Sequence, residues 1–330
     1  MCKLKSAIVL KDRIFIPDYD SHSKMLDELG INDDYLGASK KFVRVELSPL
    51  DGDPFSDVEN WELNVDQDIV PDWFSKDECK PKMIEAVKEW AKAHIHIGVD
   101  GLKIDGGKNH YIKDCKDVEI YDSATVEYIC GSATVENICG SATVENICDS
   151  ATVKNICDSA TVKYICDSAT VKYICGSATV ENICDSATVK NICDSATVKY
   201  ICGSATVENI CDSATVENIC DSATVKYICG SATVKYICGS ATVKYICGSA
   251  TVKNICDSAT VKYICDSATV KYICGSATVI SSGCYEWKKA NSMIISDNAT
   301  FKDNYGKVIY QSGNYKLISV DSETTIGELK

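Results

Sequence analysis

The sequence predicts a mainly β protein: a parallel β-solenoid of nonapeptide repeats, with a small α+β domain before it and a β-rich cap after it. From Ser123 the unit Ser-Ala-Thr-Val-x-x-Ile-Cys-x recurs without insertion, eighteen times, and the last copy, which begins at Ser276, is degenerate after Val279. Thr-Val-x-x-Ile is typical of strands, and Cys-Gly-Ser or Cys-Asp-Ser is typical of turns. A helix is excluded because an apolar period of nine matches no helical stripe.

The length of the repeat sets the size of a coil. One nonapeptide is too short to enclose a filled interior, so two repeats, about 18 residues, form the smallest coil of two strands and two turns. Eighteen copies then predict about nine coils, stacked about 4.8 Å apart through parallel ladders.

The composition changes at about Asp122, which divides the chain into three parts. All five prolines precede residue 82, and 17 of the 21 cysteines fall at one position of the repeat. We expect an α+β domain over 1–122, whose last part leads into the first rungs, the solenoid over 123–284 and the cap over 285–330. The two flanking parts are expected to cover the end coils, whose free strand edges would otherwise join end to end.

The pattern of 1–122 predicts three strands and two helices. The strands are expected over 7–16, 42–47 and 61–65, and the helices over 21–29 and from about Pro81 to His94. The longer helix has an apolar stripe of Met83, Ala86, Val87, Trp90 and Ala91. From Gly101 onward, three apolar-alternating segments are interpreted as degenerate first rungs.

The cap after Cys284 is predicted to contain short strands. Turns are expected at 304–306 and 312–314, and Ile294, Val308 and Leu317 are expected to close the last coil.

Within a repeat, variability indicates which side chains face outward. Lys or Glu and then Tyr or Asn occupy the two variable strand positions, as at Lys163 and Tyr164, and a packed interior would not exchange Tyr for Asn. Val and Ile are therefore expected inside, with Ala160 at a tight corner, and the strand must bend between Val and Ile. Cys is assigned to the interior as well. The predicted core ladder is Val162, Ile165, Cys166, Cys175, Cys184 and Cys193.

The outward positions predict an interaction surface. Glu precedes Asn five times in six, Lys precedes Tyr eight times in eleven, and Glu is concentrated in the first copies, Lys in the last. This polarity favours antiparallel self-association of two rods, Glu ends against Lys ends over a Tyr ladder. The alternative is that repeats were copied in blocks. The candidate surface residues are Tyr164, Tyr173, Tyr200, Tyr227, Tyr236, Tyr245, Lys163, Lys235, Glu127, Glu136 and Glu145.

The cysteines allow three interpretations. An odd total of 21 excludes a closed set of intramolecular disulfides, and a thiol column suits buried small side chains. The alternatives are a thiolate ladder for soft metals such as Zn²⁺ or Cu⁺, and a redox or crosslinking role. The sequence has no CxxC pair, and this disfavours the metal interpretation.

Other solenoid chemistries are less favoured. The repeat lacks the paired glycines and turn aspartates of the calcium-binding nonapeptide β-roll. Columns of Thr, beginning with Thr125, Thr134 and Thr143, are typical of an ice-binding face, but charges interrupt them. Eleven lysines among the repeats disfavour mimicry of DNA.

Catalytic and metal candidates are few. Asp18, Asp20 and His22 lie close together in the sequence, and His94 and His96 flank Ile95. Helix termini account for these histidines more simply than a carboxylate–histidine metal site does. We therefore expect no enzymatic activity, no cofactor and no metal.

The charge and the start of the chain predict its surroundings. The net charge is −13, which provides no basic patch for nucleic acid or an anionic membrane. No apolar run approaches the ~18 residues of a membrane span, and no signal-peptide core develops before Asp12. We expect a soluble, reduced, cytoplasmic protein.

The whole chain resembles a group of uncharacterised bacterial and phage-borne proteins, in which a similar domain precedes short Ser-Ala-Thr-Val repeats. The resemblance lies in Val65-Asp66-Gln67-Asp68, Pro71-Asp72-Trp73, Glu89-Trp90-Ala91-Lys92 and the repeats. It implies this architecture and a bacterial cytoplasm, and it carries no known activity.

Overall fold

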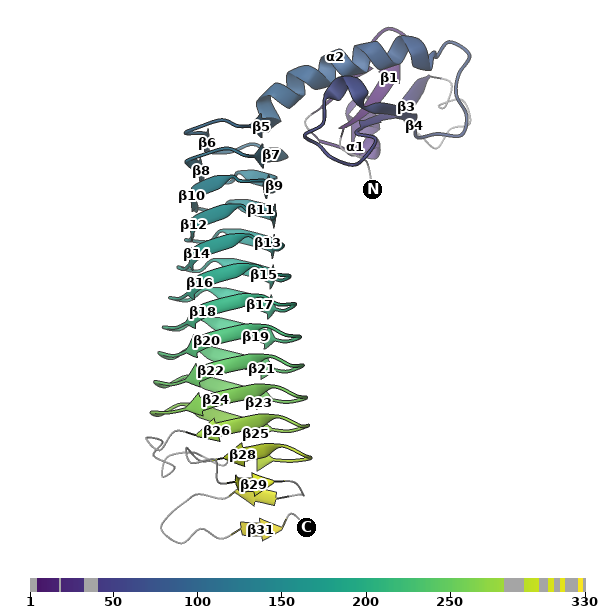
Figure 1. The fold of residues 1–330 in the computed structure, drawn as a ribbon. Coiled ribbons are helices and arrows are strands. Elements are labelled where there is room, and N and C mark those ends of the chain that lie inside the picture. Colours follow the sequence, from purple (N-terminus) through teal and green to yellow (C-terminus); the bar gives the residue numbers. More distant parts are fainter. Residues whose placement is uncertain are drawn as a thin grey trace. The chain divides into compact units, whose positions relative to one another are not determined.

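The computed structural model describes residues 5–17, 19–32, 41–281, 294–302, 308–311, 315–317 and 326–328. The chain forms two compact units: Met1–Ile97 with Lys108–Tyr111, and Gly98–Gly107 with Ile112–Lys330. The second unit is a parallel β-solenoid of about 11 turns with coils of about 18 residues (Figure 1). The turns expected at 304–306 and 312–314, and the side chains of Ile294, Val308 and Leu317, lie outside the described residues.

The first unit is an α+β fold around an antiparallel sheet of order β2-β1-β3-β4. Its strands are β1 (Lys5–Leu10), β2 (Ile14–Phe15), β3 (Phe42–Ser48) and β4 (Glu62–Val65). Its other elements are α1 (His22–Glu28), the 3₁₀ turn η2 (Val58–Asn60), α2 (Lys76–His94) and β5 (Ile95–Ile97). Val43 and Val45 join Met83 and Val87 of α2 in one buried cluster, whereas Ile8 joins Met25 of α1 in another. The two helices therefore cover opposite faces of the sheet.

Two predicted elements of this unit need correction. The strand expected over 7–16 is a hairpin, because the Leu10 amide donates to the Arg13 carbonyl and closes a turn. The helix expected from Pro81 begins at Lys76, because the Ser75 hydroxyl accepts from the Glu78 amide and caps it. Pro81 therefore lies inside α2.

The apolar stripe of α2 also differs from the prediction. Ala86 is exposed, whereas Ile84, two residues earlier and next to Met83 in the sequence, is buried. Sequence spacing alone fits both residues to a broad stripe, so the choice between them depends on where the sheet lies.

The solenoid begins before the regular repeats. Strands β6 (Lys103–Ile104), β7 (His110–Lys113) and β8 (Val118–Ile120) precede β9 (Thr125–Cys130). Strands β10 (Thr134–Ile138) to β25 (Thr269–Ile273) each run from Thr to the Ile four residues later. The last strands are β26 (Thr278–Ser281), β27 (Ile294–Ile295), β28 (Thr300–Lys302), β29 (Val308–Gln311), β30 (Tyr315–Leu317) and β31 (Ile326–Glu328). Because β6 pairs in parallel with β8, and β8 with β10, the early segments continue the repeat ladder.

Successive repeats alternate between two sheets, so residues 18 apart are neighbours in a column. In one pair of strands, Thr143, Val144 and Ile147 lie opposite Thr161, Val162 and Ile165. The third strand position, Lys or Glu, has no partner in this register. The strand bends there, which lets Val and Ile both face inward although they are three residues apart.

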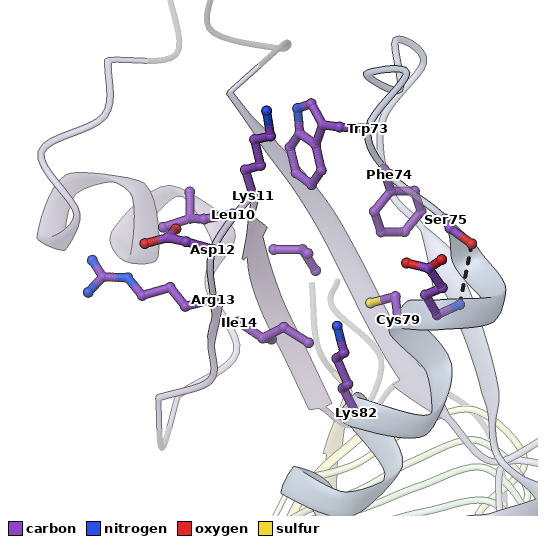
Figure 2. A pocket seen from close by; sticks show the side chains of 12 residues that line it. Leu10, Lys11, Asp12, Arg13, Ile14, Trp73, Phe74, Ser75, Cys79 and Lys82 are labelled. Atoms are coloured by element: carbon purple, nitrogen blue, oxygen red, sulfur yellow. Dashed lines mark hydrogen bonds between the residues drawn. The ribbon is translucent and has the colours of Figure 1, made fainter.

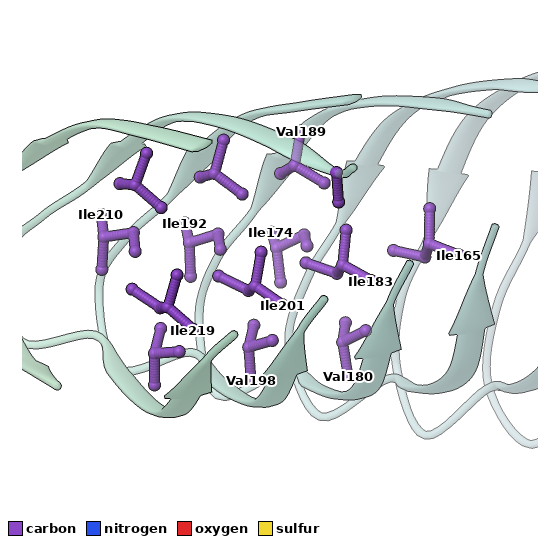
Figure 3. Packing of buried hydrophobic residues seen from close by; sticks show 14 of the residues in the cluster. Ile165, Ile174, Val180, Ile183, Val189, Ile192, Val198, Ile201, Ile210 and Ile219 are labelled. Atoms are coloured by element: carbon purple, nitrogen blue, oxygen red, sulfur yellow. The ribbon is translucent and has the colours of Figure 1, made fainter. Parts of the chain in front are cut away.

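The core of the solenoid is a stack of Ala, Val and Ile. Side chains from both sheets point toward each other in the interior (Figure 3). Ala160, Val162 and Ile165 have no exposed surface. Burial of one such Val or Ile contributes about 1.5–3 kcal/mol, and the column repeats it at every rung.

Candidate interaction surface

The outward strand positions form two separate surfaces. The odd face carries the variable side chains of odd-numbered strands β9 to β25, and the even face carries those of even-numbered strands β10 to β24. On the odd face the aromatic or amide column is Tyr128, Asn146, Tyr164, Asn182, Tyr200, Asn218, Tyr236, Asn254 and Tyr272. On the even face it is Asn137, Asn155, Tyr173, Asn191, Asn209, Tyr227, Tyr245 and Tyr263.

The predicted surface residues are therefore divided between the two faces. Tyr164, Tyr200, Tyr236, Lys163, Lys235, Glu127 and Glu145 lie on the odd face, and Tyr173, Tyr227, Tyr245 and Glu136 lie on the even face. All are half-buried or exposed. A single Tyr ladder over all copies is not formed, because consecutive repeats lie on different sheets.

Asn in this column has a structural role that the sequence did not suggest. The Asn146 side-chain amide donates to the Glu127 carbonyl oxygen at 3.3 Å, and Asn155 donates in the same way to Glu136 at 3.3 Å. Each acceptor belongs to the third strand position of the preceding coil, where the strand bends. Asn thus stabilises the bend from the next rung.

Tyr makes different contacts. On the even face, the rings of Tyr227 and Tyr245 stack with centroids 5.1 Å apart, and Tyr245 stacks on Tyr263 at 5.0 Å. On both faces the preceding Lys lies beside the ring, as at Lys163, whose Nζ is 5.5 Å from the Tyr164 centroid. These cation–π contacts give a physical reason for the Lys-Tyr coupling in the sequence.

Some opposite charges on each face pair along the columns. Lys163 Nζ lies 2.5 Å from Glu145 Oε1 on the odd face, and Lys154 Nζ lies 2.7 Å from Glu136 Oε2 on the even face. The neighbouring carboxylate raises the pKa of each of these two lysines. Both pairs are open to water, so each contributes little to stability.

The repeat cysteines after Cys130 lie at the edge of the core rather than in it. Cys166, Cys175, Cys184 and Cys193 are half-buried, and none belongs to the buried cluster. The strand ends at Ile165, so Cys166 lies between the strand and the turn that begins at Asp167, and its Sγ lies 3.8 Å from the Ile147 carbonyl oxygen of the coil before. The predicted interior position is therefore corrected: the chain leaves the strand before Cys166, and this side chain lies beside the core rather than in it.

The thiols are held in their protonated form. Burial, and then the charge of Asp185, raises the pKa of Cys184 to about 12. Burial likewise raises the pKa of Cys157 to about 11. Three groups of ligand atoms within 4.8 Å of one another occur at these edges: Cys139, Cys157 and Asp158; Cys247, Cys265 and Asp266; and Cys193, Asp194 and Asp212.

Each of the two sheets of the solenoid has one column of Thr residues. Thr143 lies in register with Thr161, one Thr per strand, and each column is half-buried or exposed. The next outward position in the same strand is Lys or Glu, so charged side chains border the Thr column. A flat array of Thr, as an ice-binding face needs, is not formed on these strands.

The first unit has an open pocket of about 440 Å³ between the β1–β2 hairpin and the start of α2 (Figure 2). Lys11, Arg13 and Lys82 surround it, and Trp73 and Phe74 form one wall. The Cys79 thiol faces the pocket, and burial raises its pKa to about 11. A thiol held protonated in this way is a weak nucleophile.

Three histidines meet at the end of α2. His94 is the last helical residue, as expected, and its Nδ1 lies 2.8 Å from the Trp90 carbonyl oxygen. His96 Nε2 lies 3.3 Å from His110 Nδ1. Burial, and then the neighbouring His110 and His94, lowers the pKa of His96 to about 4.

The residues that the His22 ring contacts are distant from it in the sequence. Ser21 caps α1, as expected, and Asp18 lies outside the described residues. The His22 ring instead contacts Asp66 and the Val45 carbonyl oxygen, with Glu46 close by. No local sequence signal connects these residues, because the sheet brings them together.

Among the described residues, no helix combines the length and apolar character that a membrane crossing requires. The chain matches no protein-family model, and neither a curated protein nor a solved structure shows significant similarity to it.

Proposed function

We propose that the protein is a non-enzymatic scaffold whose solenoid pairs side by side with a second copy, antiparallel, through the odd face. The observation that carries this proposal is the order of charges and side-chain sizes along that face. Both copies have the same 18-residue rungs, so two odd faces laid against each other keep one register along their length.

In one antiparallel register every charge on the overlapping rungs meets its opposite. The pairs are Glu127 with Lys253, Glu145 with Lys235, Lys163 with Glu217, and Glu181 with Lys199. The two-fold axis repeats each pair, and each exposed pair is worth about 0.2–1 kcal/mol. A shift of one coil instead sets Glu181 opposite Glu217.

The same register matches side-chain sizes. Tyr128 lies opposite Asn254, Asn146 opposite Tyr236, Tyr164 opposite Asn218, and Asn182 opposite Tyr200. Each ring therefore meets a small amide, which allows two flat faces to approach closely. The even face has Asn and Tyr in blocks, and six Lys against two Glu in its charged column, so it does not match itself in this way.

A charge-swap experiment tests the pairing. E127K or K253E alone sets like charges against each other twice per dimer, so we expect the dimer dissociation constant in low salt to rise about tenfold or more. The double variant E127K/K253E restores both pairs and is expected to restore association. Sedimentation equilibrium at low and high salt measures the dissociation constants.

The even-face variant K244E is the matched control, and it should leave association unchanged. A monomer in low salt, or equal effects of K253E and K244E, would reject the odd-face dimer. Within one chain, E127K lies next to Glu145 in the column, and K253E lies between Lys235 and Lys271. Both single changes therefore lessen repulsion inside the column and do not threaten the fold.

The alternative function is a thiol one, soft-metal sequestration or redox sensing. The Cys-Cys-Asp groups at the solenoid edge favour it, because two thiolates and a carboxylate suit Zn²⁺. The raised thiol pKa values favour the scaffold, because a protonated thiol is neither a good ligand nor a good nucleophile.

A further inference from the structure

We propose that His22, Glu46 and Asp66 in the first unit bind a divalent transition-metal cation. One ligand atom from each of the three residues lies within 4.8 Å of the others. They come from α1, from β3 and from the residue that follows β4, so the sheet brings together groups that are up to 44 residues apart.

The hydrogen bonding of His22 orients it as a ligand. The ring is buried, and its Nε2 lies 3.2 Å from the Val45 carbonyl oxygen, which only accepts hydrogen bonds. Nε2 must therefore carry a proton. In the neutral ring this leaves the Nδ1 lone pair directed at the carboxylates, with Asp66 Oδ2 3.2 Å away. Metal-bound histidines typically have their second nitrogen tied to a carbonyl in this way.

A buried hydroxyl points to a ligand as well. Ser6 lies directly opposite Glu46 in the β1–β3 ladder, so both side chains are on the same face of the sheet. Ser6 is fully buried, and its Oγ has no hydrogen-bond partner among the residues that the structure describes. A metal-bound water is a partner that this hydroxyl could use.

Charge also favours a cation. Glu46 and Asp66 are joined by Asp20, whose Oδ1 accepts a hydrogen bond from the Ser6 amide at 3.1 Å. Arg44 is on the same face, two residues from Glu46. A divalent ion at His22 would offset the remaining negative charge.

The donor set indicates the class of metal. One imidazole and two carboxylates suit Mn²⁺ or Zn²⁺ better than Ca²⁺, which prefers oxygen alone. Metal–ligand bonds of about 2.1 Å require donor atoms about 3 Å apart. The Asp66 side chain, 59% exposed, is free to swing the short distance needed and leaves a path for the ion.

The test uses the full-length protein and Mn²⁺, because Zn²⁺ would also bind the thiols of the repeats. Loss of the free-ion EPR signal is expected to show one Mn²⁺ bound per chain. Affinity should fall about tenfold or more in D66N and in H22Q, and stay unchanged in D68N, which removes a nearby acid outside the trio.

A second measurement distinguishes loss of the metal site from misfolding of a variant. Mn²⁺ is expected to raise the melting temperature reported by tryptophan fluorescence in the wild type and D68N, but not in D66N. Asp66 is exposed, so D66N should fold even if H22Q does not. Absence of binding at millimolar Mn²⁺, or equal binding by wild type and D66N, would overturn the proposal. Neither result bears on the odd-face dimer.

Discussion

The first residue of each solenoid turn has a left-handed backbone, and only Gly and Asp occupy it in the repeats. Asp194 has φ +54° and Gly176, one coil earlier, has φ +62°. Asp194 Oδ2 accepts a hydrogen bond from the Gly176 amide at 3.0 Å, so the side chain joins two coils. Glycine adopts this conformation without strain, whereas Asp tolerates it and adds a hydrogen bond.

Asp194 both adopts the left-handed backbone and accepts the hydrogen bond, and these two roles predict the effect of substitutions there. D194A loses the hydrogen bond, and Ala tolerates the left-handed backbone less well than Asp does. It should therefore destabilise the solenoid by about 2 kcal/mol. D194N keeps an acceptor oxygen and should cost less than about 0.5 kcal/mol. Urea denaturation followed by circular dichroism measures both. Equal midpoints for D194A and D194N would show that the turn conformation does not limit stability.

The cysteines next to these turns should be poorly reactive. Burial raises the pKa of Cys184, Cys211 and Cys220 to about 12, against 9.0 for a model thiol. The thiolate fraction at neutral pH is then about 10³-fold lower than in the unfolded chain. Iodoacetamide labelling followed by mass spectrometry should be slow in the native protein and fast in urea. Rapid labelling of the native protein would favour the thiol function over the scaffold.

The same pKa shift has a consequence for stability. The pKa is higher in the folded protein, so the stabilisation is complete below pH 9 and is lost as the pH rises toward 12. The urea midpoint of the solenoid should therefore fall on the alkaline side.

At the scale of the element, one coil is the unit of stability. Residues 195–212 contain β17 (Thr197–Ile201) and β18 (Thr206–Ile210), and their removal joins Asp194 to Ser213 with the repeat intact. Each coil contacts only its two neighbours, so deletion of this coil should leave a folded solenoid with slightly lower stability.

A buried substitution gives the contrast. I201N places an amide in a fully buried position and should cost about 3–5 kcal/mol, more than loss of the whole coil. Urea midpoints compare the two variants. Collapse of the deletion variant, with I201N folded, would contradict a modular stack.

The solenoid could be predicted to the level of the single residue where the physics is local. Exchange of Tyr for Asn identified Lys163 and Tyr164 as outward, and burial of Val162 and Ile165 confirms the inward assignment. Cys166 could not be placed, because its direction depends on how the turn leaves the strand. The predicted coil of two strands already implied two faces, but the single predicted Tyr ladder combined residues of both.

In the first unit, the missing information was of two kinds. The Ser75-x-x-Glu78 signal for the start of α2 was present in the sequence, but Pro81 suggested a later start. The contact of His22 with Asp66 had no local signal, because it depends on the order of strands in the sheet. Non-local pairing of this kind is what a sequence pattern does not specify.

At the scale of the whole molecule, the two units have different sources of stability and should respond differently to pH. The solenoid is a repeated apolar stack whose described pKa shifts are mainly those of thiols, on the alkaline side. The first unit contains His96, whose pKa is about 4 in the folded state against 6.5 in a model compound. We therefore expect its histidines to affect the stability of this unit at acid pH.

The sign of the His96 effect follows from proton uptake. Between pH 6.5 and 4 the unfolded chain binds a proton at His96 and the folded unit does not, so the first unit loses stability as the pH falls through this range. Allowing for the partial exposure of the ring, the loss should be about 1–2 kcal/mol. His110 and His94, which face His96, stay in place in the variant H96Q.

Two probes separate the units in one experiment. Three of the four tryptophans, Trp61, Trp73 and Trp90, lie in the first unit, so fluorescence reports mainly on that unit, whereas circular dichroism is dominated by the solenoid strands. On acidification from pH 7 to pH 4.5, the fluorescence melting temperature should fall several degrees more in the wild type than in H96Q, because H96Q has no imidazole to protonate on unfolding. The dichroism transition should shift equally in both proteins. An equal fluorescence shift in the two proteins would show that carboxylates such as Asp20, rather than His96, control the acid stability of this unit.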